Sequence, residues 1–125
     1  MSKRILVIED DRILRKACET SLTKRGFALL TASNGADGIR QAEEHLPDLI
    51  LLDMRMPNLT GAETLTALKQ NQKTRNIPVL ILSNSSSEAS MQKAETLGAA
   101  GYLVKASMSL RELGDVVAEF LESTD

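Results

Sequence analysis

Four short apolar runs stand out along the chain, and each is followed by polar residues suited to chemistry. The runs are 5–8 before Glu9, Asp10 and Asp11, 49–52 before Asp53, 79–82 before Ser83, and 102–104 before Lys105. Continuous Val, Ile and Leu runs of this length are typical of strands buried on both faces of a parallel sheet. Because ligands of such sheets bind beyond the carboxyl ends of the strands, we expect these polar groups to meet at one edge.

Between the runs, apolar residues recur at helical spacing. The pattern predicts helices at 13–22 (closed by Gly26), 36–44, 62–70, 88–97 (capped by Gly98) and 110–121, an edge strand at 27–32, and loops at 54–61 and 83–87. The first of these loops is marked by Pro57, Asn58 and Gly61. Five strands alternating with five helices predict an α/β fold with a parallel sheet and right-handed crossovers.

The composition limits the class of protein. The 125 residues, 42% hydrophobic and 26% charged, fit one soluble domain over 1–125 without an output domain. Cys18 is the only cysteine, which excludes an internal disulfide and favours a cytoplasmic setting. We expect no membrane contact, because no apolar run reaches spanning length and the N-terminus does not resemble a signal peptide. A net charge of −2 and 2% aromatic residues give no basis for nucleic-acid binding by this domain.

The acidic residues predict a metal site. Two carboxylates about 4 Å apart repel by roughly 4 kcal/mol at an effective dielectric constant near 20, so Glu9, Asp10 and Asp53 need a cation or raised pKa values. Ligands that are all oxygen, without His or Cys, favour Mg²⁺. Asp53 stands alone at the end of the central strand, so we interpret it as a nucleophile. The alternative for the run of acids at 9–11 is capping of the next helix, and Asp11 fits that role.

Two other side chains complete the expected site. The ammonium of Lys105 suits an oxygen of an acyl phosphate, and Ser83 offers a hydroxyl donor. Taken singly, a lysine after a strand is usually a surface residue, and a serine there usually forms a turn. Their common position at strand ends favours the functional interpretation. His45, the only histidine, is expected at the opposite edge of the sheet, so catalysis by a histidine of this chain is not expected.

Together these segments resemble the receiver domain of bacterial two-component response regulators. The resemblance covers essentially the whole chain and rests on four motifs. They are ILVIEDD at 5–11, DLILLDMRMPNLTG at 48–61, PVLILS at 78–83 and GAAGYLVKA at 98–106. Each motif is weak alone, but their order and spacing are highly specific. The resemblance implies a flavodoxin-like (βα)5 fold, with strand order 2-1-3-4-5 and helices on both faces of the sheet.

The resemblance also implies roles for individual residues. Asp53 would be the phosphoacceptor, and Lys105 would contact the phosphoryl group. Mg²⁺ would be held by Asp10 and the main-chain carbonyl of Arg55, with Glu9 and Asp53 completing the acidic site. Ser83 would be a switch hydroxyl and Tyr102 an aromatic switch that changes rotamer with phosphorylation.

The implied partners follow from these roles. The phosphoryl donor would be a phosphohistidine on a sensor histidine kinase or a histidine phosphotransfer protein. Phosphorylation would change the surface formed by the fourth helix, fifth strand and fifth helix. That surface would meet a downstream protein target, which the sequence does not identify, or a second copy in a phosphorylation-dependent homodimer.

The chain departs from the family pattern at three positions. Ala106 replaces the proline that usually follows the lysine, Asn84 follows Ser83 where a smaller residue is common, and Arg55 is unusually large and positive. Two rival functions remain open. A Mg²⁺-dependent phosphohydrolase working through an aspartyl phosphate usually has a second Asp two residues after the nucleophile, where this chain has Arg55. A degenerate receiver acting as a constitutive docking module is disfavoured by the intact acids and Lys105.

Overall fold

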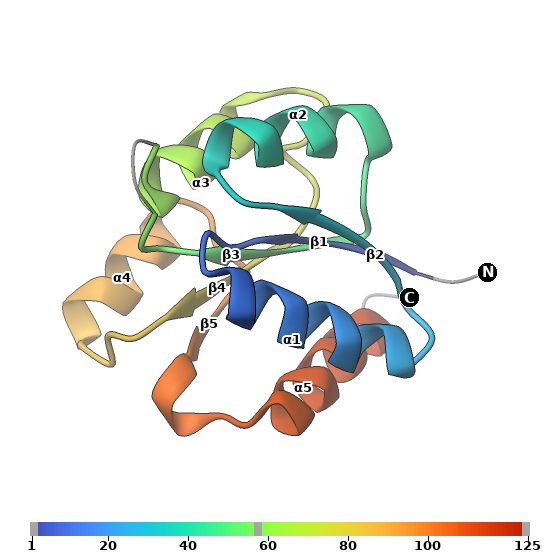
Figure 1. Cartoon of the computed structure of the whole chain (residues 1–125). Coiled ribbons are helices and arrows are strands. Elements are labelled where there is room, and N and C mark those ends of the chain that lie inside the picture. Colours follow the sequence, from blue (N-terminus) through green and yellow to red (C-terminus); the bar gives the residue numbers. More distant parts are fainter. Residues whose placement is uncertain (1–2, 57–58, 124–125) are drawn as a thin grey trace.

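A five-stranded parallel sheet forms the centre of the molecule. The computed structural model describes residues 3–56 and 59–123; Pro57 and Asn58, which mark the predicted turn, lie outside the described residues. The strands are β1 (Arg4–Ile8), β2 (Ala28–Ala32), β3 (Leu49–Asp53), β4 (Val79–Ser83) and β5 (Gly101–Val104). They lie in the order β2-β1-β3-β4-β5, so the predicted topology is confirmed, with β2 at an edge (Figure 1).

Five α-helices alternate with the strands. They are α1 (Arg12–Lys24), α2 (Gly35–His45), α3 (Gly61–Gln70), α4 (Glu88–Thr96) and α5 (Leu110–Ser123). α1 and α5 cover one face of the sheet, and α2, α3 and α4 cover the other (Figure 1). Each predicted helix is confirmed, and its ends lie within two residues of the predicted ones. Gly26 and Gly98 have φ values of 94° and 103°, which suits glycine at the turns that follow α1 and α4.

The apolar runs supply both layers of the core. On β3, Ile50 and Leu52 pack beneath α2, α3 and α4, whereas Leu49 and Leu51 pack beneath α1 and α5. Side chains alternate across a strand, so a sheet covered on both faces requires apolar residues at every position. α4 contributes least to this core, because Ala94 is its one buried residue.

The strand register decides which side chains meet. Ile8 pairs with Leu52, so Glu9 and Asp53, the next residues, lie beside each other at the carboxyl edge. Ser83 pairs with Val104, which places Lys105 directly beyond β5 on the same edge. His45 lies at the other edge, where its carbonyl accepts a hydrogen bond from Arg4 at the start of β1. In the described residues, no helix has the length and apolar character needed to cross a membrane.

The loop after β3 requires a glycine at its end. An added Cβ at Gly61 would lie 2.4 Å from the Cα of Met54 and 2.6 Å from the carbonyl oxygen of Asp53. Both are main-chain atoms, so the clash could not be relieved by a side-chain rotation. The start of α3 is fixed by reciprocal capping between Thr60 and Glu63. This loop therefore returns closely onto the end of β3.

Candidate functional site

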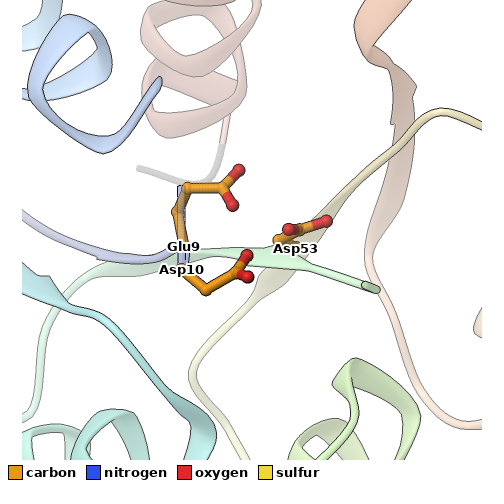
Figure 2. Close-up of side chains that lie close together, drawn as sticks. All are labelled: Glu9, Asp10 and Asp53. Carbon is orange, nitrogen blue, oxygen red and sulfur yellow. The ribbon is translucent and has the colours of Figure 1, made fainter. Parts of the chain in front are cut away.

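Three carboxylates meet at the carboxyl edge of the sheet, as the strand ends predicted. Glu9 and Asp10 follow β1, and Asp53 ends β3 (Figure 2). One carboxylate oxygen from each residue lies within 4.8 Å of those of the other two. Glu9 and Asp53 are buried, whereas Asp10 is exposed. The cluster therefore has a buried floor and one acid open to solvent.

Lys105 joins this cluster from the end of β5. Its Nζ lies 3.0 Å from Glu9 Oε1 and 3.2 Å from Asp53 Oδ1. Burial alone would lower the pKa of Lys105, but the hydrogen bond that Lys105 donates to Glu9 and the charges of Asp53 and Glu9 raise this pKa above its usual value. The ammonium is therefore fully charged at neutral pH. It bridges the two buried carboxylates.

The buried Glu9 is the most strongly perturbed acid of the site. Burial, followed by its hydrogen bond with Asp53, raises the pKa of Glu9 to about 8, although Lys105 acts in the opposite direction. A second bond from the N–H of Asp11 to Glu9 Oε2, at 3.2 Å, also favours the charged form. When all three carboxylates are ionised, the single ammonium of Lys105 offsets only part of their negative charge, and a hard cation would neutralise the rest.

The donor set fits Mg²⁺. All three side chains offer oxygen, and two carboxylates with waters and phosphate oxygens are the usual ligands of this ion. Asp10 is the most available ligand, since its carboxylate has no hydrogen bond to any group in residues 3–56 or 59–123. Arg55 is adjacent, because its N–H donates to Asp53 Oδ1 at 3.1 Å. Its carbonyl as a ligand stays a prediction.

Ser83 and Tyr102, the predicted switch residues, are joined through a third residue. Ser83 Oγ accepts from the N–H of Ser85 at 3.1 Å, and the hydroxyl of Tyr102 donates to the carbonyl of Ser85 at 2.8 Å. The hydroxyl of Ser85 is in turn 3.1 Å from that of Ser87 and 3.2 Å from that of Ser90. Since Ser87 caps α4, Ser85 connects the end of β4, β5 and the start of α4.

The structure places the three residues that depart from the family pattern, Ala106, Asn84 and Arg55, without distortion of the main chain around them. Lys105–Ser107 is a short 3-10 turn, and no cis peptide bond occurs in the described residues, so Ala106 follows Lys105 in the trans form. Asn84 and the side chain of Arg55 are exposed. Within the described chain, Arg55 forms no ion pair with Glu88.

Asp11 and Arg15 have structural contacts that bear on the site. Asp11 is the N-cap of α1 and accepts from the N–H groups of Ile13 and Leu14, so its capping interpretation is confirmed. Arg15 was not predicted; it donates to the carbonyl oxygen of Glu9 at 2.9 Å. Side chains of a helix lean towards its N-terminus, so a long residue on the second turn can reach the preceding loop. That geometric signal could have identified Arg15 from the sequence.

Comparison with known proteins agrees with the fold. The family model of the response regulator receiver domain matches residues 5–118 of this chain. The regulatory protein PrrA of Mycobacterium tuberculosis is 39% identical over 104 residues, which are 83% of this chain and 44% of that protein. Protein PilG of Pseudomonas aeruginosa is 30% identical over 115 residues, covering 92% of this chain and 85% of PilG. For several transcriptional regulators, this chain thus spans less than half of the relative's length.

Solved structures give the same result. The receiver domain of Francisella response regulator 1452 matches with a TM-score of 0.90 and 27% identity, covering 99% of this chain and 100% of that one. The chemotaxis protein CheY4 of Vibrio cholerae matches with a TM-score of 0.89 and 25% identity, covering 95% and 98%. With the strand order and the acidic edge described above, these matches show that the chain belongs to the receiver domain family of two-component response regulators.

Proposed function

We propose that this receiver domain is a phosphorylation-controlled switch in which Asp53 accepts a phosphoryl group. The donor is the phosphohistidine of a sensor histidine kinase or a histidine phosphotransfer protein, and Mg²⁺ is held by Asp10, Glu9, Asp53 and the Arg55 carbonyl. One observation carries the proposal. Asp53 is only 2% exposed, yet its carboxylate lies beside those of Glu9 and Asp10 and within 3.2 Å of the ammonium of Lys105.

The residues of the chain divide the chemistry of transfer. A carboxylate oxygen of Asp53 forms the new bond to phosphorus, while the bond from phosphorus to the donor imidazole breaks and its electron pair returns to nitrogen. Lys105, already 3.2 Å from Asp53 Oδ1, donates to an oxygen of the incoming group. A bound magnesium ion supplies further neutralisation of the phosphoryl oxygens. Positioning and charge compensation are therefore the contributions of the protein.

The donor protein must cover the open rim of the site. Ile13 is a strong candidate contact, because 82% of it is exposed although it is large and apolar. It lies three residues after Asp10, within about 11 Å of chain length, and its N–H is held by Asp11. Ile13 and Leu110 also line an open groove between α1 and α5. A donor that buries Ile13 would bring its phosphohistidine towards Asp53.

Ser83 and Tyr102 would transmit phosphorylation of Asp53 to the surface that binds the downstream protein. A phosphoryl group adds roughly −1.5 to −2 charge and new acceptor oxygens beside Ser83. Ser83 then turns to donate to one of these oxygens and releases the N–H of Ser85, which frees Tyr102 to rotate. The changed surface of α4, β5 and α5 binds a downstream protein or a second copy of the chain.

The test is phosphorylation by acetyl phosphate, followed by intact mass measurement. We expect one added phosphoryl group with Mg²⁺ and none with a chelator or in Asp53→Asn. Asp11→Asn is the matched control, since Asp11 caps α1 and lies outside the cluster; it should label normally. Labelling of Asp53→Asn would overturn the assignment of the phosphoacceptor. No labelling of the wild type would favour a constitutive docking module, and rapid turnover of small phosphate esters would favour a phosphohydrolase.

A further inference from the structure

The side chain of Arg15, on α1, contacts the main chain of the loop that carries Glu9 and Asp10. Its Nη1 donates to the carbonyl oxygen of Glu9 at 2.9 Å and lies 3.4 Å from the carbonyl oxygen of Asp10. The side chain is half-buried, and its main chain belongs to α1, where its N–H donates to the carbonyl of Asp11. The guanidinium of Arg15 thus links α1 to Glu9 and Asp10, the first two residues of the acidic cluster.

The two acids differ in how firmly they are held. Glu9 is fixed from several sides: its N–H donates to Ala32, and its carboxylate accepts from Lys105 and from the N–H of Asp11. Asp10 is exposed, and in residues 3–56 and 59–123 no group other than Arg15 hydrogen-bonds to it. Arg15 therefore contacts the carbonyls of both peptides that flank the Cα of Asp10, and the second of these peptides is also held by the bond from the N–H of Asp11 to Glu9 Oε2.

The charge of Arg15 acts against a cation site. A guanidinium close to a metal site repels the ion, so its electrostatic contribution to metal affinity is unfavourable. Its hydrogen bonds have the opposite effect, because a carboxylate held in place loses less freedom when the ion binds. The sign of the change on removing Arg15 therefore separates the two effects.

We propose that Arg15 is a positioning residue for the magnesium site. By holding the carbonyls of Glu9 and Asp10, it presents the Asp10 carboxylate to the ion beside Asp53 before the ion arrives. This inference rests on the proposed function, since it takes the cluster of Glu9, Asp10 and Asp53 as the metal site. Groups that orient metal ligands typically change metal affinity by about 10- to 100-fold.

The experiment is titration of the whole chain with Mg²⁺ by calorimetry. Arg15→Met keeps the side-chain length and removes the donors, and we expect it to bind Mg²⁺ about tenfold more weakly. Arg15→Lys keeps the charge and one reachable donor and should give an intermediate affinity. Arg12→Met is the matched control, because Arg12 is an exposed cation on the same helix and, among the described residues, Arg15 rather than Arg12 donates to the loop carbonyls. It should bind as tightly as the wild type or more tightly.

A second measurement separates positioning from damage to the fold. The rate of labelling by acetyl phosphate should reach the wild-type maximum in Arg15→Met, but at a higher Mg²⁺ concentration. Equal or tighter binding by Arg15→Met would overturn the inference and leave the proposed function intact. A wild type that binds no Mg²⁺ would overturn both. If Arg15→Met does not fold, Arg15→Lys decides, and wild-type affinity in that variant would overturn the inference.

Discussion

The hydroxyl of Tyr102 donates a hydrogen bond of 2.8 Å to the main-chain carbonyl of Ser85, which ties β5 to the loop after β4. The N–H of the same residue donates to Ser83 Oγ. The two predicted switch residues therefore hold opposite sides of one residue. A change at Ser83 has a direct path to Tyr102 through a single peptide segment, without rearrangement of the sheet.

Beryllofluoride should displace both ends of this link. In the complex with Mg²⁺, fluorine atoms stand in for phosphoryl oxygens on Asp53, and we expect Ser83 Oγ to turn towards one of them and Tyr102 to change rotamer. The NMR amide signals of Ser85 and Tyr102 should shift together. Tyr102→Phe lacks the hydroxyl, so its Ser85 signal should be displaced before beryllofluoride is added. Unchanged positions of both side chains would refute the switch.

The metal-free protein should lose stability as the pH rises. The pKa of Glu9 is raised to about 8, mainly by burial and by its bond with Asp53, from a usual value of 4.5. Between these values the folded state binds more protons than the unfolded state, so this contribution is complete at low pH and disappears as the pH passes 8. Its slope is at most about 1.4 kcal/mol per pH unit. Urea unfolding in chelator from pH 5 to 9 measures it.

Glu9→Gln provides the control for this pH dependence. The amide resembles the protonated carboxyl in shape but does not titrate, so the decline between pH 5 and 8 should flatten. An equally steep decline in this variant would assign the effect to another group.

Arg55 should lengthen the life of the phosphorylated state. Hydrolysis needs a water in line with the bond from Asp53 to phosphorus. The exposed Arg55 follows Asp53 by two residues, in the loop that borders this bond. We expect Arg55→Asn to lose the phosphoryl group faster than the wild type, on the order of tenfold, or about 1.4 kcal/mol in the barrier. Asn84→Ala should also accelerate loss, but less. Decay is followed after removal of acetyl phosphate, and equal or slower loss from Arg55→Asn would exclude protection by Arg55.

Ile13 should matter for a protein donor and not for a small one. With the kinase that transfers fastest in a profile of candidate histidine kinases, Ile13→Ser should slow transfer about tenfold, which corresponds to about 1.4 kcal/mol of lost apolar contact. Labelling by acetyl phosphate should stay near the wild-type rate. Leu46→Ser is a matched control, since Leu46 is also large, apolar and exposed but follows α2 at the opposite edge. Equal slowing by both variants would indicate a general loss of solubility or fold.

The sequence predicted the fold and the meeting of the site residues, but not how those residues contact one another. The strand order and the meeting of Glu9, Asp53 and Lys105, at the edge where Ser83 ends β4, follow from apolar runs whose pattern predicts buried parallel strands. The bridge from Lys105 to Glu9 depends on side-chain rotamers, and the role of Ser85 depends on a contact between residues 17 apart. Such pairings arise only when the elements are packed together.

The shallow anchoring of α4 has a thermodynamic consequence. Its single buried residue, Ala94, contributes on the order of 1 kcal/mol of apolar burial, whereas each buried leucine of α3 contributes roughly twice as much. Displacing α4 therefore requires only a small part of the free energy that holds the whole domain together. The rest of the domain can stay folded while α4 moves. Substitutions at the exposed positions of α4 can therefore change which protein it binds with little effect on folding.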